Sequence, residues 1–293
     1  MLRPVIRELQ HRTGIRCHSS GVRVVGGGSI NQAFKVPGDP RPLFVKINRA
    51  SSLPDFEAEA EGLEAVRSAG GLAVPEILAS GCIGETAYLA LGWVEMGSRT
   101  VAAQQRLGAG LAEQHRATAA DFGWHRDNTI GATPQRNTPS GDWLEFFGRE
   151  RLEFQLELAR RNGLPGRQRS QGRKISERLE GLFSGYRPEP SLLHGDLWSG
   201  NWGADEAGTP YLFDPAVYYG DREADLAMTR LFGGFGAAFY AAYEDRWPLA
   251  PGWERRVDLY NLYHLLNHFN LFGAGYLGQV GTVLDRLLDS AGS

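Results

Sequence analysis

The segment His194 to Asn201 (HGDLWSGN) contains the side chains that are best suited to chemistry. Asp196 and Asn201 stand five positions apart, and Asp214 follows a second apolar run thirteen residues later. Phosphoryl transfer needs a carboxylate to accept the proton of the attacking hydroxyl, and oxygen ligands for magnesium. We therefore expect Asp196 to be the proton acceptor and Asn201 and Asp214 to bind Mg²⁺. Aspartate and asparagine are also common in ordinary loops, and His194 is expected to pack and hydrogen-bond this loop.

Lys46 is the basic residue placed to reach bound phosphates. It ends an apolar run that begins at Leu43. A lysine in that position needs an acidic partner, and the helix expected next offers Glu59 as first choice and Glu57 as second. The alternative is a lysine and a helix face that are both exposed to solvent, the usual case for a single lysine.

A run of glycines precedes Lys46 in the chain. Bare backbone lets N–H groups approach phosphate oxygens, so we expect Gly27, Gly28 and Ser29 to contact a nucleotide. The run does not match the dinucleotide-binding or Walker A patterns, because Asn31 replaces the third glycine and no Gly-Lys-Ser/Thr follows. A plain β-hairpin is the alternative.

Four side chains are candidates for contact with the phosphoryl acceptor: Trp198, Asn128, His264 and His268. The tryptophan could stack on a sugar or pack in the core. The two histidines share one stripe of a predicted helix, where they could line the acceptor pocket or form interior hydrogen bonds. Zinc is not expected, because the H-E-x-x-H pattern is absent. Asp225 is expected to hydrogen-bond the backbone of the catalytic loop.

These residues fall in two regions that differ in their predicted secondary structure. Short apolar strands and turns dominate the first part, and helical patterns dominate beyond residue 98. Strands are expected at 22–25, 33–36, 43–48 and 87–94, and helices at 1–14, 54–69, 101–118, 143–162, 171–183 and from 222 onward. We predict a bilobal α+β fold. Its N-lobe, 1–94, has an antiparallel sheet and one main helix and binds the nucleotide; its larger, mostly helical C-lobe, 95–293, holds the catalytic loop and the acceptor site.

Composition limits the class of protein. The chain has 293 residues, 42% hydrophobic and 22% charged, with a net charge of −3. These values are typical of a globular protein and do not favour nucleic-acid binding. Cys17 and Cys82 are too few for a disulfide framework, and no apolar run reaches the roughly 18–20 residues that a membrane span needs. We expect a cytoplasmic monomer without nucleic-acid or membrane partners. Glycine is in excess at 38 residues, and Gly108 and Gly110 lie unexplained inside a helical pattern.

Longer stretches of the chain resemble the fructosamine kinase (ketosamine-3-kinase) family, which has an aminoglycoside-phosphotransferase-like and protein-kinase-like fold. HGD-x4-N marks the wider group of small-molecule kinases, whereas HGDLWSGN together with DPA-x-YYGDRE is more specific. The resemblance is carried by LFVKIN at 43–48, FGWHRDNTIGATPQRN at 122–137, HGDLWSGN at 194–201, FDPAVYYGDREADLAM at 213–228, FGGF at 232–235 and LYNLYHLLNHFNLFG at 259–273.

The resemblance implies ATP-dependent phosphorylation of a ketosamine at its sugar 3-hydroxyl, which would serve repair of glycation. The acceptor would be a small ketosamine or a glycated lysine of a protein. It also implies that Lys46, paired with Glu59, steadies the ATP phosphates, and that a hinge contacts adenine through Gly92, Trp93 and Val94. The same scaffold also serves kinases of aminoglycosides, choline, methylthioribose or homoserine, and a nucleotide-binding protein without activity is a further alternative. The glycine-rich loop lacks the cysteine of many eukaryotic relatives, so a redox-linked dimer is not expected.

Overall fold

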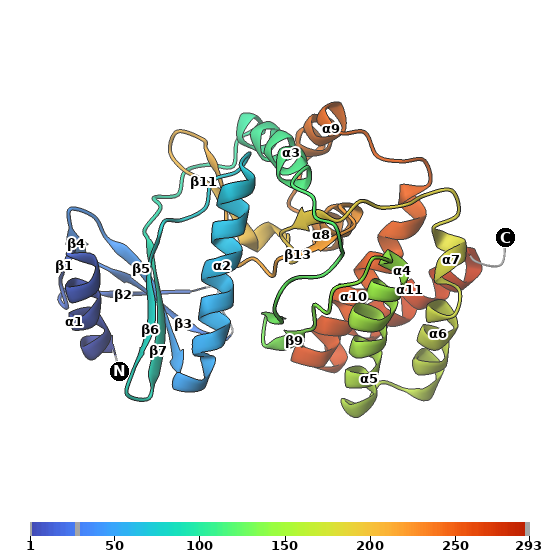
Figure 1. Cartoon of the computed structure of the whole chain (residues 1–293), viewed down its shortest axis with the longest axis horizontal. Helices are drawn as coiled ribbons and strands as arrows, with labels where there is room; N and C mark the ends of the chain where they lie inside the picture. Colours follow the sequence, from blue (N-terminus) through green and yellow to red (C-terminus); the bar gives the residue numbers. More distant parts are fainter. Residues whose placement is uncertain (1, 27–29, 291–293) are drawn as a thin grey trace.

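A five-stranded antiparallel sheet forms the core of the N-lobe in the computed structural model, which describes residues 2–26 and 30–290 (Figure 1). Its strand order is β2 (Arg23–Val25), β3 (Gln32–Val36), β5 (Leu43–Arg49), β7 (Thr86–Gly92) and β6 (Ile77–Ile83). The predicted meander is confirmed, with β7 ending two residues early. Strand β6 was not predicted, because the small and polar residues Ala79, Ser80 and Gly81 interrupt its apolar pattern.

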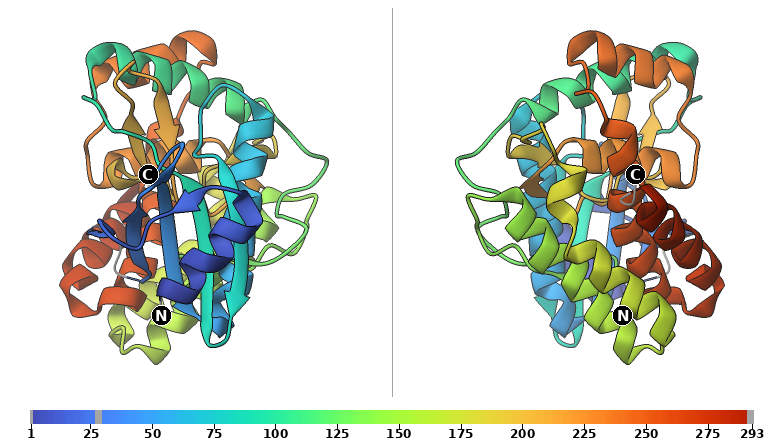
Figure 2. Two further views of the ribbon diagram at one scale, coloured as in Figure 1. Left: turned by 90° about the vertical axis from the view of Figure 1, so that its left-hand side faces the viewer. Right: turned by 90° about the vertical axis from the view of Figure 1, so that its right-hand side faces the viewer.

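Helices cover both faces of this sheet. Helix α1 (Leu2–Thr13) lies on one face and α2 (Leu53–Ala69) on the other (Figures 1 and 2). Alternate residues of β5 point to opposite faces, so Val45 packs in the cluster with α1 while Lys46 faces the side of α2. A small second pairing joins β1 (Arg16–Cys17) to β4 (Gly38–Asp39).

The C-lobe is mostly helical, as predicted. Its helices are α3 (Val101–His115), α4 (Trp143–Phe146) continued by a π-helical segment (Phe147–Glu153), α5 (Phe154–Arg161), α6 (Gly166–Ser176), α7 (Leu179–Leu182), α8 (Glu223–Leu231), α9 (Ala237–Arg246), α10 (Trp253–Phe272) and α11 (Leu277–Ser290). Three two-stranded antiparallel pairs complete it in the described part of the chain: β8 (Asn128–Ile130) with β9 (Thr133–Gln135), β10 (Ser191–Leu193) with β13 (Tyr218–Gly220), and β11 (Trp202–Ala204) with β12 (Pro210–Leu212).

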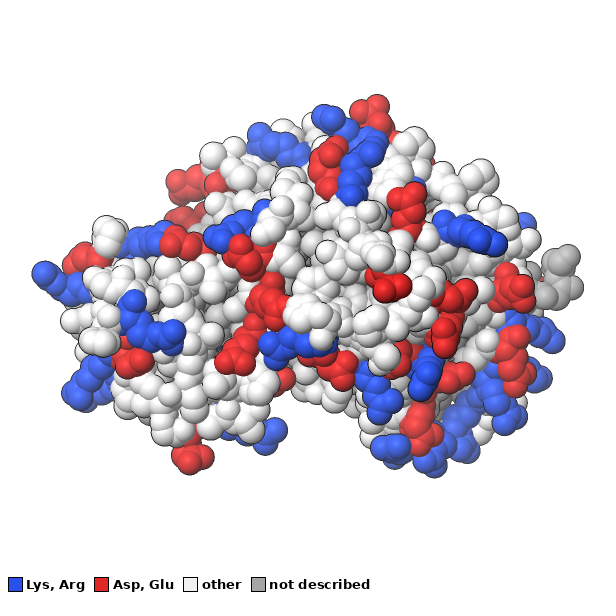
Figure 3. Space-filling model, in the orientation of Figure 1, with Lys and Arg blue, Asp and Glu red and all other residues white. Residues whose placement is uncertain are grey.

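Two predicted helix boundaries are wrong. The helix expected at 171–183 begins earlier, at Gly166, and is divided into α6 and α7 between Ser176 and Leu179. The start of α6 was missed because the helix is rich in arginine and buries only Gly172 and Ile175. Helix α3 ends at His115, three residues early. The charged side chains of both signs are interspersed over the face drawn in Figure 3, with Lys and Arg gathered near α5 and α6. Among the described residues, no helix combines the length and apolar character needed to cross a bilayer.

The two unexplained glycines allow close packing of α3. A Cβ on Gly108 would lie 2.1 Å from the carbonyl oxygen of Phe239 in α9. A Cβ on Gly110 would lie 2.3 Å from the carbonyl oxygen of Gly71, which follows α2. Real Cβ atoms do not approach backbone oxygen this closely, so part of the glycine excess is structural and serves helix packing.

Candidate active site

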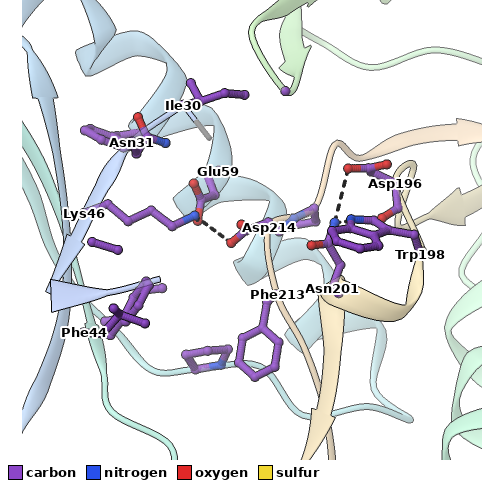
Figure 4. A pocket seen from close by; sticks show the side chains of 18 of the residues that line it. Ile30, Asn31, Phe44, Lys46, Glu59, Asp196, Trp198, Asn201, Phe213 and Asp214 are labelled. Carbon is purple, nitrogen blue, oxygen red and sulfur yellow. Dashed lines mark hydrogen bonds and ion pairs between the residues drawn. The ribbon is translucent and has the colours of Figure 1, made fainter. Parts of the chain in front are cut away.

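A cleft of about 980 Å³ lies between the two lobes (Figure 4). The N-lobe contributes β5, α2 and the segment after β7, and the C-lobe contributes the loops after β10 and β12, the β8–β9 hairpin and the end of α10. Of the predicted site residues, those lining it are Lys46, Glu59, Gly92, Trp93, Val94, Asn128, Asp196, Trp198, Asn201, Asp214 and His268. Gly27, Gly28 and Ser29 lie outside the described residues, and their neighbours Gly26 and Ile30 line the cleft.

Lys46 connects the two lobes by ion pairs. Its Nζ lies 2.7 Å from Glu59 Oε1 on α2 and 2.6 Å from Asp214 Oδ1 of the C-lobe. Burial lowers the pKa of Lys46, but the two carboxylates outweigh burial and hold it above its usual range, so the ammonium stays charged. Burial raises the pKa of Glu59 to about 7, against the opposing effect of Lys46. Glu57, the second-choice partner, is exposed on α2.

The loop after β10 brings Asp196 and Asn201 together. Asn201 Nδ2 donates to the backbone oxygen of Asp196 at 2.8 Å and to its Oδ2 at 3.2 Å. The amide nitrogen is thereby used, and the amide oxygen Oδ1 is left for a ligand. Burial raises the pKa of Asp196 to about 7, helped by the charge of Asp214 and opposed by the hydrogen bond from Asn201. A carboxylate in this range can take and release a proton near neutral pH.

His194 ties the two acidic loops together. Its Nδ1 accepts the N–H of Asp196 at 3.2 Å, so Nε2 carries the hydrogen and donates to the backbone oxygen of Phe213 at 2.9 Å. The histidine is fully buried, and burial lowers its pKa. Asp214, next to Phe213, has a φ of 52°, the single positive value among non-glycine residues of the described chain. Such conformations concentrate at functional sites.

Asp225 of α8 holds the start of the same loop. Its carboxylate accepts the N–H groups of His194 at 2.7 Å and Gly195 at 2.9 Å, as expected from the sequence. Burial raises the pKa of Asp225. The hydrogen bond from His115, the charges of His115 and His194 and the hydrogen bond from the His194 backbone outweigh burial and hold the pKa below its usual range. Gly195 has a φ of 82°, and a Cβ there would lie 2.0 Å from the oxygen of Ala216.

The three predicted hinge residues, Gly92, Trp93 and Val94, also line the cleft. The N–H of Gly92 donates to Glu76 at 2.8 Å, and that of Trp93 donates to Pro42 at 3.2 Å, both to backbone oxygens. Those two donors are therefore engaged within the protein. Val94 is the third residue of the predicted hinge, and its N–H has no backbone partner among the described residues.

The four acceptor candidates differ in their surroundings. Trp198 is 38% exposed, its ring lies against Gly200, and both line the cleft. His268 also lines the cleft, with Nδ1 2.8 Å from the backbone oxygen of His264. His264 itself is buried behind the cleft wall, and burial lowers its pKa to about 3. His264 does not line the cleft, and its Nδ1 has no hydrogen-bond partner among the described residues, so the interior hydrogen bond expected as the alternative is not seen at that atom either.

Asn128 forms hydrogen bonds that fix the structure around the cleft, and so do Gln135 and Asn48, which were not predicted from the sequence. Asn128 donates to the backbone oxygen of Val217 at 2.8 Å and accepts from Gln135 at 2.8 Å, so its amide fixes the β8–β9 hairpin at the cleft. Asn48 donates to Asn31 Oδ1 at 2.7 Å and ties the glycine-rich loop to β5. No local sequence pattern marks these pairs, because the bond between Asn128 and Gln135 depends on the register of the β8–β9 hairpin, and Asn48 and Asn31 lie 17 positions apart.

The site combines a strand lysine paired with a helix glutamate and, across the cleft, a loop that carries an aspartate and an asparagine, followed by a second aspartate. The cleft lies between a sheet lobe and a helical lobe. This combination defines a phosphotransferase of the kinase-like class. Solved structures agree with this fold. An aminoglycoside phosphotransferase crystallised with ADP and hygromycin B matches with a TM-score of 0.65 at 16% identity, over 96% of this chain and 98% of that one. A candidate fructosamine-3-kinase of Thermobifida fusca matches with a TM-score of 0.87 at 33% identity, over 97% and 98%.

Sequence comparisons give the family. The family model described as fructosamine kinase matches residues 1–290. A "probable ketoamine kinase" of Synechocystis is 43% identical over 97% of this chain and 96% of its own, and a chloroplastic protein-ribulosamine 3-kinase of Arabidopsis thaliana is 42% identical over 97% and 87%. The chain belongs to the fructosamine kinase family. It is accordingly a kinase, an enzyme that transfers a phosphoryl group to a hydroxyl acceptor.

Proposed function

We propose that this enzyme transfers the γ-phosphoryl group of ATP to the sugar 3-hydroxyl of a ketosamine. The observation that carries the proposal is the convergence of Lys46, Asp196 and Asp214 on one cleft, together with the ketoamine and ribulosamine specificity in the names of relatives about 40% identical. The acceptor is a free ketosamine or a glycated lysine, and the product supports repair of glycation. A cytoplasmic location and a monomeric state stay predictions.

The N-lobe, residues 1–94, holds the nucleotide in this proposal. Adenine lies at the hinge, where Val94 donates its N–H, and the phosphates lie beneath the glycine-rich loop, including Gly27, Gly28 and Ser29. Lys46 neutralises phosphate charge, and Glu59 fixes the direction of its side chain. The acceptor enters from the C-lobe side, residues 95–293.

The chemistry of the donor set fits Mg²⁺. Asn201 presents a free amide oxygen and Asp214 a carboxylate that is about half exposed, and magnesium prefers such oxygen ligands. When bound, Mg²⁺ would neutralise charge on the phosphates. The residues of the chain position the reactants, which supplies most of the reduction in barrier in phosphoryl transfer.

Asp196 orients the acceptor hydroxyl and takes its proton as the oxygen attacks phosphorus. The hydrogen bond from Asn201 fixes the carboxylate in place. Trp198 offers an exposed ring against which a sugar can stack, and His268 keeps Nε2 available because Nδ1 is engaged by the backbone. Asn128 shapes the far wall through the β8–β9 hairpin.

Purified enzyme and Mg·ATP should be tested with a panel of ribulosamines and fructosamines, and with an aminoglycoside, choline, methylthioribose and homoserine. The proposal predicts ADP release with ketosamines and loss of this release in Asp196→Asn. Activity confined to another acceptor contradicts the proposed substrate. Thermal stabilisation by ATP without ADP release from any acceptor supports a protein that binds nucleotide without catalysis.

A further inference from the structure

One arginine of the C-lobe is completely buried and bonds only to neutral oxygens. Arg151 lies in the π-helical segment that continues α4, has no solvent exposure and does not line the cleft. Buried charges are usually paired with an opposite charge. We propose that Arg151 is a positioning residue for the acceptor, because its guanidinium fixes the β8–β9 hairpin at the wall of the cleft. The inference rests on the proposed function, which makes this wall part of the acceptor site.

The guanidinium of Arg151 binds the segment directly after β9. Nη1 donates to the backbone oxygen of Arg136, and Nη2 donates to Asn137 Oδ1 at 2.7 Å. A guanidinium is always protonated in proteins and carries only donors, so the direction of both bonds is fixed. One planar group thereby holds two consecutive residues, one by the backbone and the other by the side chain.

Asn137 extends this connection to the segment that leads into β8. Because its Oδ1 accepts from Arg151, Nδ2 is the donor of the amide, and it lies 3.0 Å from the backbone oxygen of Arg126 and 3.0 Å from Asn128 Oδ1. The backbone N–H of Asn137 donates to Asp127 Oδ1 at 2.8 Å. Both ends of the hairpin are therefore tied, directly or through Asn137, to one guanidinium.

Aromatic rings surround Arg151 where an acidic partner would be expected. Its Cζ lies 4.0 Å from the ring centroid of Tyr218, 4.7 Å from that of Phe146 and 5.9 Å from that of Tyr263. The faces of such rings attract a cation, and a flat guanidinium stacks on them better than an ammonium does. Lysine would keep the charge but lacks the fork that reaches two oxygens at once, so it does not replace arginine here.

The tip of the hairpin, residues 128–132, lines the cleft. Strands β8 and β9 have three residues each, so a shift at the base of the hairpin is carried to the tip. The loop after β12 keeps a separate bond to the hairpin, from Gln135 Nε2 to the backbone oxygen of Ala216 at 3.0 Å. Lys46 belongs to the N-lobe sheet and has no bond to this network. Loss of Arg151 should therefore weaken acceptor binding and spare ATP binding.

The experiment compares Arg151→Lys, which keeps the charge, with Arg151→Met, which removes both the charge and the fork. We expect the KM for a ribulosamine to rise about 5- to 20-fold in both variants, with the KM for ATP within twofold, because small misplacements at a reaction site are costly. Failure of lysine to restore the KM separates the fork from the charge.

Two further variants complete the set. Arg256→Lys is the matched control, because Arg256 is also buried, at 2% exposure, but pairs with Glu223 at 2.6 and 2.8 Å and has no bond to the hairpin. It should lower the melting temperature and leave both KM values unchanged. Asn137→Ala keeps Arg151 and cuts its connection to the segment before β8, so it should reproduce the rise in acceptor KM even if the Arg151 variants do not fold.

Hydrogen exchange gives a second readout that needs no acceptor. A peptide covering residues 126–137 reports the hairpin and both of its ends. It should exchange about tenfold faster in Arg151→Lys and Asn137→Ala, because the bonds that close the base of the hairpin are lost, and at the wild-type rate in Arg256→Lys.

A wild-type acceptor KM and wild-type exchange in Asn137→Ala and in a folded Arg151→Lys would overturn the proposal. An equal rise of the KM for ATP, or the same rise of the acceptor KM in Arg256→Lys, would also overturn it, because the effect would then be a general loss of packing. A wild-type enzyme that is inactive on every ketosamine contradicts the proposed function instead, and the exchange measurement still decides whether Arg151 fixes the hairpin.

Discussion

Replacing Lys46 with methionine should lower the free energy of unfolding, because Lys46 is the shared cation of both interlobe ion pairs. The Lys46 side chain is 7% exposed and that of Glu59 is 13% exposed, so the substitution leaves a buried carboxylate without its counter-charge. Breaking a buried pair in this way costs about 3–5 kcal/mol. The Asp214 side chain is 53% exposed, so water can solvate its carboxylate when Lys46 is removed. We therefore assign the loss of stability to Glu59.

The cost should depend on pH in a defined direction. The pKa of Glu59 is already raised to about 7 with Lys46 present, and it rises further in Lys46→Met. A carboxyl group whose folded-state pKa is raised loses stability as pH increases from its unfolded value through its folded value. The variant should therefore be closest to wild type near pH 5 and most destabilised near pH 8.

Urea unfolding at pH 5, 6, 7 and 8 measures this effect. The double variant Lys46→Met/Glu59→Gln should recover about 2 kcal/mol at pH 8 relative to the summed single variants. Lys35→Met is the control, since its partner Glu95 is solvent-exposed, and its loss should change the free energy of unfolding far less than the loss of Lys46. A pH-independent loss in Lys46→Met, or additivity in the double variant, would refute the reasoning.

Four further predictions concern the site and the fold. Asp196→Asn should lower kcat by about 10²–10⁴-fold with ATP affinity by calorimetry within twofold; unchanged turnover contradicts its role. In the wild type, a pKa of about 7 for Asp196 implies that kcat rises roughly tenfold from pH 6 to pH 8, as the carboxylate loses its proton; a flat profile would count against it as acceptor. Trp198→Ala should raise the KM for the acceptor and leave that for ATP unchanged in steady-state assays; the reverse pattern would place the ring at the nucleotide. Gly108→Ala should cost about 3 kcal/mol in chemical unfolding, since its Cβ meets a backbone oxygen at 2.1 Å, whereas Gly181→Ala, in open space, should be neutral; equal stabilities would contradict the packing.

Much of the fold was predictable because its patterns are local. The apolar run at 43–48 indicates a strand, and the helix expected at 54–69 follows from its apolar spacing. Strand β6 escaped prediction because its partners, not its own residues, make it a strand. The first part of helix α6, residues 166–170, escaped because its residues are almost all polar.

In the candidate site, too, contacts between residues close in sequence were predictable, and contacts between distant residues were not. Asp196 and Asn201 are close in sequence, so their spacing already indicates their proximity. His115 gave no such signal, because its partner Asp225 lies 110 residues away and the bond depends on how α3 packs against α8. His264 and His268 share a helix stripe, but His268 is nearer the end of α10 that reaches the cleft, a distinction that needs the tertiary structure.

The central claim is that a ketosamine is phosphorylated at its sugar 3-hydroxyl. The most direct measurement is ³¹P and ¹³C NMR of a ribulosamine incubated with the enzyme and Mg·ATP. We expect a new phosphate monoester coupled to carbon 3 of the sugar, formed in equal amount to ADP and absent with Asp196→Asn. A phosphate on a different sugar position, or no phosphorylated ketosamine while another acceptor is consumed, would contradict it.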